Sequence, residues 1–135
     1  QDGPMYQAGN LSGNPIAMTA GLATLQILSR PHVYEDLNDK ATRFILKLKD
    51  ALEPKGIYIS HVGSMFTPYF TPEGKAPRNF GDVQQSDLGE FARFWRYMYA
   101  NGVYLSPSQF ETNFVSIQHT DEQLDHIVEL AKDYK

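Results

Sequence analysis

The stretch Gly9-Asn10-Leu11-Ser12-Gly13-Asn14-Pro15 runs directly into the small-residue segment Ile16-Ala17-Met18-Thr19-Ala20-Gly21-Leu22-Ala23. Asn followed by Pro predicts a helix start, because Asn caps the first turn and Pro has the backbone angle of its first position. The loop before that start is rich in free backbone N–H groups. Such a loop can wrap an anion at the positive end of the helix dipole, although the same pattern also describes an ordinary capped turn.

Outward from this loop, hydrophobic periodicity predicts the order helix–helix–strand–strand–helix–strand–strand–helix. The predicted helices are residues 14–29, residues 33–52 with a stop at Lys55-Gly56, a third that Ser86 caps and that ends at Asn101-Gly102, and a fourth that opens with a capping box of Thr120 and Gln123. The first of them is apolar on most sides, so we expect it to be buried or to lie at an interface.

The predicted strands are residues 57–61, 65–70, 103–105 and 114–117, with a turn near Gly63 between the first two. Pro68 would sit badly in a central strand, so we expect its strand at an edge or with a bulge. Together the elements predict an α+β fold, in which helices cover one face of a small antiparallel or mixed sheet of about three to four strands.

Composition narrows the classes of function. The formal net charge of -4 is spread over the chain without a basic stripe, which argues against a nucleic-acid partner. No apolar run has the length of a membrane-spanning helix, so no membrane is expected either. The chain has no Cys, which excludes disulfides, thiolate metal sites and a Cys nucleophile and fits a cytoplasmic protein. The sequence begins without Met, so we expect it to be part of a longer protein.

Two groups of polar residues are candidates for a functional site. The four histidines have no shared metal-ligand spacing, so no metal site is predicted. The loop of residues 106–111 offers a carboxylate, an amide and two hydroxyls directly after a buried strand. It can be an ordinary surface loop or part of a binding site.

Several blocks of the sequence resemble the C-terminal third of the glutamate-1-semialdehyde 2,1-aminomutase family, which is a branch of the class III aminotransferases. The matching blocks are residues 3–4, 6–9, 11–15, 17–18, 63–66, 102–111 and 116–120. They lie in the family's order and at roughly its spacing. The resemblance implies the C-terminal domain of a pyridoxal-phosphate enzyme of fold type I.

That resemblance also implies an activity. The family isomerises glutamate 1-semialdehyde to 5-aminolevulinate, a precursor of tetrapyrroles (porphyrins), by moving an amino group between adjacent carbons with pyridoxal 5'-phosphate and pyridoxamine 5'-phosphate as cofactor forms. The lysine that binds the cofactor in this family lies upstream, and none of the lysines here has its sequence context. We therefore expect these 135 residues to be inactive by themselves.

The resemblance places two parts of the site on this chain. Gly9, Asn10 and Leu11 match a loop that reaches across a dimer to the cofactor phosphate of the partner subunit. Where the family usually has Thr, this chain has Asn10, whose amide donates with a different reach. Glu111 matches a residue of the aminomutases that stands where many class III aminotransferases have Arg, and a carboxylate there can hold a substrate ammonium.

The expected organisation follows from the same resemblance. Residues 1–12 are expected to lead in from a large cofactor-binding domain, and residues 13–135 to form the small C-terminal domain. The implied partners are that large domain, a second subunit in a homodimer and a small-molecule substrate. Two other interpretations stay open: the same domain in another class III aminotransferase, and a non-catalytic binding module.

Overall fold

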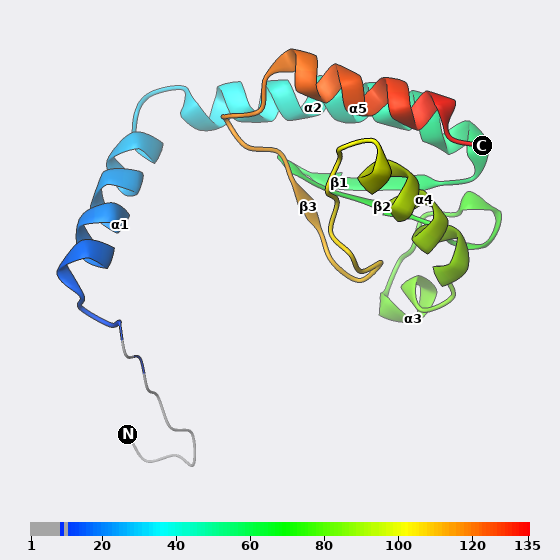
Figure 1. The fold of residues 1–135 in the computed structure, drawn as a ribbon, viewed down its shortest axis with the longest axis horizontal. Helices are drawn as coiled ribbons and strands as arrows, with labels where there is room; N and C mark the ends of the chain where they lie inside the picture. The colour runs from blue at the N-terminus through cyan, green and yellow to red at the C-terminus, as the bar shows by residue number, and fades with distance from the viewer. Residues whose placement is uncertain (1–8, 10) are drawn as a thin grey trace, which may run out of the picture. The chain divides into compact units, whose positions relative to one another are not determined.

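The structure, a computed structural model, describes residue 9 and residues 11–135. The chain divides into two compact units, Gln1–Tyr34 and Glu35–Lys135. The first contains helix α1 (Pro15–Leu28), and the second contains a sheet and the other helices (Figure 1).

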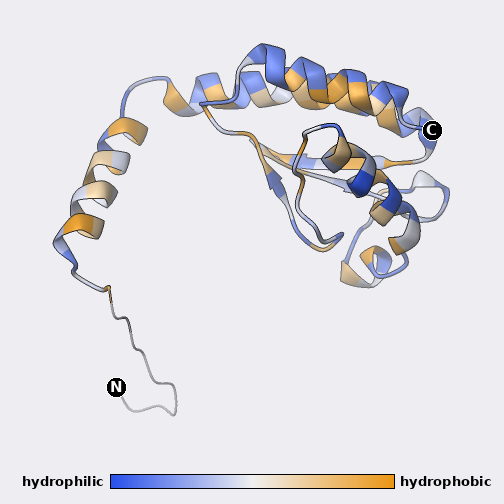
Figure 2. Cartoon of the chain, viewed as in Figure 1, coloured by the Kyte–Doolittle hydropathy of each residue, from blue (hydrophilic) through white to orange (hydrophobic). Residues whose placement is uncertain are grey.

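Helix α1 begins and ends where the sequence predicts. The side chain of Asn14 caps its first turn, Pro15 is its first residue, and Ser29 is its C-terminal cap. No residue of α1 is buried against the described part of the chain. Hydrophobic residues run along it without a continuous polar face (Figure 2). The expectation of a buried helix is therefore not met within these residues, and an interface for α1 stays a prediction.

Helix α2 (Val33–Leu52) is amphipathic and also matches its prediction. One side of it packs into the core, whereas the other carries charges, as the alternating colours in Figure 2 show. The short 3-10 helix η1 (Glu53–Lys55) follows, and Gly56 then turns the chain with a φ of 81°. This conformation strains any residue with a side chain, which explains why the stop signal is a glycine.

Within the described residues, three strands form an antiparallel sheet in the order β1-β2-β3. They are β1 (Tyr58–Val62), β2 (Met65–Tyr69) and β3 (Asn113–Phe114), and Gly63 makes the β1–β2 turn with a φ of 55°. Ile59, Phe66 and Phe70 share the buried face, on which α2, α4 and α5 pack. The predicted fold class, with helices on one face of a small sheet, is confirmed.

The strand that contains Pro68 is the middle one, so its prediction as an edge strand is wrong. β3 pairs only with Met65 and Phe66, however, and ends before it reaches Pro68. The carbonyl of Pro68 and the N–H of Phe70 both face that uncovered side. Because the nitrogen of Pro68 faces the same way, the proline removes no hydrogen bond from the β1–β2 ladder.

The connection after β2 holds the 3-10 helix η2 (Pro72–Gly74) and the short helix α3 (Phe80–Val83) before α4 (Leu88–Ala100). Asp87, not Ser86, caps α4, because the carboxylate of Asp87 accepts a hydrogen bond of 2.9 Å from the N–H of Glu90. Residues 103–105 belong to no strand, so that predicted strand is wrong. Residues 114–117 contribute only the end of β3.

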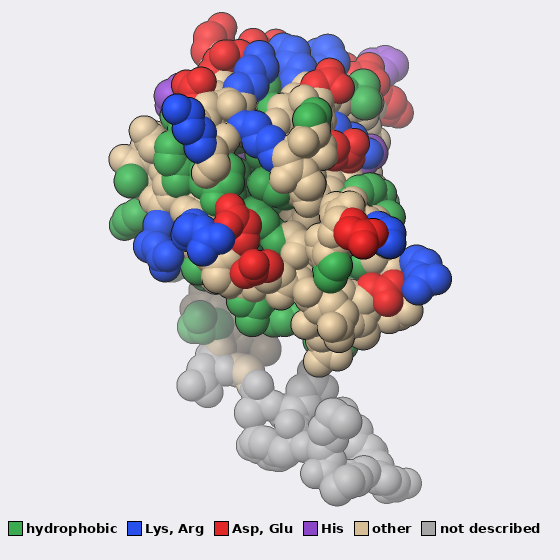
Figure 3. All heavy atoms as spheres, turned by 90° about the vertical axis from the view of Figure 1, so that its right-hand side faces the viewer, with side chains coloured by type: hydrophobic (Ala, Val, Ile, Leu, Met, Phe, Trp, Pro, Cys, Tyr) green, Lys and Arg blue, Asp and Glu red, His purple; other side chains and the backbone are tan. Residues whose placement is uncertain are grey.

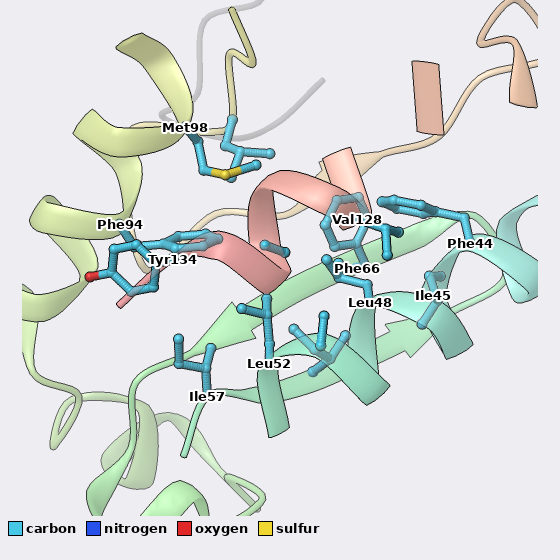
Figure 4. Close-up of a cluster of buried hydrophobic side chains, with 14 of the residues drawn as sticks. Phe44, Ile45, Leu48, Leu52, Ile57, Phe66, Phe94, Met98, Val128 and Tyr134 are labelled. Carbon is cyan, nitrogen blue, oxygen red and sulfur yellow. The ribbon is translucent and has the colours of Figure 1, made fainter. Parts of the chain in front are cut away.

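Helix α5 (Asp121–Asp133) closes the unit, and its predicted capping box of Thr120 and Gln123 is present. α5 lies beside α2, as the 2.6 Å ion pair between Lys47 and Asp125 shows. The core of this unit joins α2, α4 and α5 to the sheet (Figure 4). The rings of Phe44 and Phe66 meet edge to face at 5.4 Å, and those of Phe94 and Tyr134 do so at 5.0 Å.

The surface of this unit carries both signs of charge without a single-sign patch on the face in Figure 3. Among residues 9 and 11–135, no helix is long and apolar enough to span a membrane.

Candidate functional site

The loop from residue 106 to residue 113 connects the residues after α4 to β3, and hydrogen bonds of its own side chains hold it closed. Oδ1 of Asn113 accepts a hydrogen bond of 2.8 Å from the N–H of Ser106, which closes the loop at its base. Nδ2 of the same Asn113 donates to the carbonyl of Phe66 at 3.4 Å. One side chain thus ties both ends of the loop to β2.

Glu111 projects from this loop with an exposed side chain. The hydroxyl of Ser106 donates a 2.6 Å hydrogen bond to its Oε2, and its own N–H donates to the carbonyl of Ser108 at 3.2 Å. A carboxylate has about four acceptor positions, so one bond from Ser106 orients the group and leaves it able to accept from a ligand. The arrangement suits a cationic group such as an ammonium, which Glu111 can bind with charge-assisted hydrogen bonds.

Sequence reasoning singled out Glu111 but missed the residues that hold it. The sequence assigns no separate role to Ser106 or Asn113, and nothing in it points to Thr67, whose hydroxyl lies 3.5 Å from the carbonyl oxygen of Glu111. Neither helical nor strand periodicity would bring side chains five residues apart, such as Ser106 and Glu111, together. The closed conformation of the loop brings them into contact.

The glycine loop lies in the other unit. Gly9 and Leu11 are described, whereas Asn10 lies outside the described residues, and so does any contact it makes. The N–H of Ser12 donates to the carbonyl of Gly9 at 3.2 Å, and that of Asn14 to the carbonyl of Leu11 at 3.0 Å. A Cβ on Gly9 would clash with Oγ of Ser12, so another residue at this position would require the Ser12 side chain to rotate away.

The start of α1 offers an anion fewer donors than the sequence suggests. Oδ1 of Asn14 already accepts from the N–H groups of Ile16 at 3.0 Å and Ala17 at 3.2 Å. Among the described residues, the amides of Leu11 and Gly13 have no hydrogen-bond acceptor. A phosphate at this loop would thus be held by loop amides rather than by the first turn of the helix. Glu111 and the glycine loop belong to different units of the chain.

Residues 9 and 11–135 contain no group of three or more His, Cys, Asp or Glu side chains that could hold a metal ion. His119 has a structural contact, since its Nδ1 accepts a hydrogen bond of 2.9 Å from the N–H of Ser116.

A second polar cluster joins α4 to the end of α5. The hydroxyl of Tyr134 and the guanidinium of Arg93 both donate to the carboxylate of Glu90. Burial, followed by the bond to this carboxylate, raises the pKa of the Tyr134 phenol to about 12. The hydrogen bond from Tyr134, followed by the pairing with Arg93, lowers the pKa of Glu90. Each carboxylate oxygen of Glu90 has a partner within the chain, so the cluster acts as a tie between helices.

Comparisons with known proteins were made over the full length of the chain. No protein-family model matches it. The chain is 46% identical over 133 residues to the glutamate-1-semialdehyde 2,1-aminomutase of Desulforapulum autotrophicum, an alignment that covers 97% of this chain and 31% of that protein. A second such enzyme, from Desulfitobacterium hafniense, is 44% identical over the same share of this chain. The chain therefore spans less than a third of the length of the curated relatives it matches.

A solved structure agrees in fold. The crystal structure of a glutamate-1-semialdehyde aminomutase from Pseudomonas aeruginosa PAO1 superposes with a TM-score of 0.78 at 20% identity, over 98% of this chain and 30% of that one. At this identity the likeness concerns the fold alone. Across nearly all of its length, this chain is thus similar to one segment of the glutamate-1-semialdehyde 2,1-aminomutases and has the fold of the corresponding segment of a solved one.

Proposed function

We propose that this chain is the C-terminal segment of a pyridoxal-phosphate aminomutase that converts glutamate 1-semialdehyde to 5-aminolevulinate. Its 46% identity to a curated aminomutase over 97% of its length supports the enzyme class. One observation on the chain itself carries the proposal: Glu111 is an exposed carboxylate that Ser106 orients through a 2.6 Å hydrogen bond.

In this proposal Glu111 acts on the intermediate that carries two amines: it binds the ammonium that is not reacting while the other amine reacts. The cofactor, when bound, supplies an electron sink for the transfer of the amino group. Ser106 keeps one carboxylate oxygen occupied, so the carboxylate has a fixed direction before the substrate arrives. A group held in advance costs less entropy on binding than a free side chain does.

The glycine loop is proposed to hold the cofactor phosphate of the partner subunit in a homodimer, through Gly9, Asn10 and Leu11. The residues fit an anion in one respect, because the amides of Leu11 and Gly13 have no acceptor among the described residues. The lysine that binds the cofactor is proposed to lie in a large domain, with residues 1–12 leading from it and residues 13–135 forming the small domain. The enzyme is proposed to act in the cytoplasm.

Glu111→Gln in the full-length protein tests the substrate role. The loss of the charge weakens its hydrogen bond to an ammonium by about 1.5–3 kcal/mol, so turnover of glutamate 1-semialdehyde should fall about 10- to 150-fold. Spectroscopic titration should show cofactor affinity close to that of the unchanged protein.

Glu53→Gln is the matched control for this experiment, since Glu53 is an exposed glutamate on η1, outside the loop. It should leave both readouts unchanged. Normal turnover in Glu111→Gln would show that the assigned role is wrong.

A second candidate is a class III aminotransferase with a separate amino donor. It is favoured by the fold, which matches a transaminase with bound pyridoxal phosphate at a TM-score of 0.71 and 18% identity. An assay with and without an external amino donor distinguishes the two, because an aminomutase needs none.

A further inference from the structure

Gln109 is the buried member of the loop that carries Glu111. Of residues 106–114 it is the one that is buried, at 2% exposure, whereas Glu111 and the others are exposed or half-buried. Its Nε2 donates a 2.8 Å hydrogen bond to the carbonyl of Pro68, and its Oε1 accepts one of 3.3 Å from the N–H of Phe70. The side chain thus binds β2 directly.

The position on β2 explains why a glutamine is needed. β3 pairs with Met65 and Phe66 and ends there, so beyond it the carbonyl of Pro68 and the N–H of Phe70 face a side on which residues 9 and 11–135 place no strand. Both residues are buried, and their backbone groups cannot be left without partners at low cost. A primary amide presents a donor and an acceptor side by side, which matches a carbonyl and an N–H two residues apart.

The rest of the loop makes weaker contacts with the sheet. The hydroxyl of Thr67 lies 3.5 Å from the carbonyl oxygen of Glu111, and the Asn113–Phe66 bond is 3.4 Å long. The Ser106–Glu111 bond is internal to the loop and moves with it. Gln109 is therefore the buried attachment, two residues before Glu111.

We propose that Gln109 is a positioning residue that fixes the loop of residues 106–113, and with it the Glu111 carboxylate, against the uncovered side of β2. The link to catalysis rests on the function proposed for Glu111, whereas the attachment of the loop to β2 is independent of that function.

The experiment compares Gln109→Met and Gln109→Glu in the full-length enzyme. Met has similar length and no hydrogen-bonding group, so hydrogen exchange in residues 65–71 and 106–113 should become about 10- to 100-fold faster. Turnover of glutamate 1-semialdehyde should fall about tenfold or more through kcat, with cofactor affinity within about twofold. Tyr97→Phe is the control, because it removes a 3.2 Å bond to the carbonyl of Leu130 outside the loop. It should leave loop exchange and turnover unchanged.

Gln109→Glu adds a readout that a purely structural role elsewhere would not produce. A protonated carboxyl can donate to Pro68 and accept from Phe70 as the amide does, whereas a carboxylate can only accept. Exchange in the two segments, corrected for its intrinsic pH dependence, should be slow at acidic pH and become faster as the pH rises. This variant also keeps the test open if Gln109→Met does not fold.

The outcomes separate the two proposals. Unchanged exchange in both Gln109 variants would overturn the positioning role. Faster exchange with normal turnover would instead show that the loop is attached through Gln109 but that Glu111 has no part in the reaction. Faster exchange with reduced turnover supports both.

Discussion

The two units of this chain differ in what their helices bury. α1 leaves Ile16 81% and Leu25 63% exposed, although it is the more apolar helix. In α2, Ala41, Ile45 and Leu52 are each 0% exposed. Both helices begin where local signals predict, but only α2 gains the burial from which most helix stability in proteins comes. Helix signals thus fix where a helix forms and leave open what holds it.

The comparison predicts that core truncations destabilise only the second unit. Phe94, which is 2% exposed, contacts the ring of Phe70 at 5.6 Å and that of Tyr134 at 5.0 Å. Phe94→Ala should lower the free energy of unfolding by about 3–5 kcal/mol, because it removes these contacts and leaves a cavity. Urea unfolding of the 135-residue chain measures this effect.

The matched truncation in the first unit is Leu25→Ala. It should change the free energy of unfolding by no more than about 0.5 kcal/mol, since little of this side chain leaves water. An equal loss for Leu25→Ala and Phe94→Ala would contradict the comparison, because it would mean that α1 belongs to the same core.

The elements that the sequence predicted well are those set by local patterns. α2 and α5 follow a helical period with caps or stops at their ends, so their bounds need no tertiary information. The prediction of a strand at residues 103–105 was wrong because residues with high strand propensity do not show whether a partner strand is available. Asp87 displaced Ser86 as a cap, and two adjacent capping residues leave that choice to the tertiary structure.

The site shows the same division. Glu111 could be proposed from the sequence because the resemblance carries a role for it. The attachment through Gln109 could not, since it joins residues 41 positions apart in the sequence. One signal was present: Pro68 in a buried strand implies a place where a side chain must replace strand pairing.

The tie between α4 and α5 gives the second unit a specific pH dependence. The pKa of Tyr134 is raised to about 12 in the folded chain, chiefly by burial and then by the bond to Glu90. A raised pKa contributes stability that is present below the ordinary value near 10 and is lost as the pH rises through about 12. Tyr134→Phe should therefore abolish this alkaline loss, and at neutral pH it should cost about 1–2 kcal/mol for the missing hydrogen bond.

Denaturant unfolding between neutral and alkaline pH measures this difference, with Tyr34→Phe in the first turn of α2 as the control. Tyr34 is 54% exposed, and its hydroxyl makes no hydrogen bond within the described residues. Removal of the Tyr34 hydroxyl should leave the dependence of stability on pH unchanged.

At acidic pH, the lowered pKa of Glu90 contributes stability that is present above the ordinary value of 4.5 and is lost as the pH falls through the folded value. A Tyr134→Phe profile that still declines like the unchanged chain at high pH would assign the alkaline loss to another group.

The smallest effect is expected from removing a helix cap, and it can be compared between the two units because each contains a helix with a side-chain cap. Asn14 accepts from two N–H groups of α1, and Thr120 accepts from the N–H of Gln123 at 3.2 Å in α5. Replacing either cap with Ala should cost its helix about 1 kcal/mol. Thr120→Ala should lower the free energy of global unfolding by that amount, because α5 packs in the core.

Asn14→Ala should leave global unfolding unchanged and appear only locally, as exchange about five- to tenfold faster in the first turn of α1. Hydrogen exchange measured residue by residue, alongside urea unfolding, separates the local from the global loss. Asn14→Asp keeps an accepting side chain at the cap and should restore slow exchange. If Asn14→Ala instead lowers global stability as much as Thr120→Ala does, α1 contributes to the same cooperative unit as α5, and the exposure of its apolar side chains cannot reflect its energetic independence.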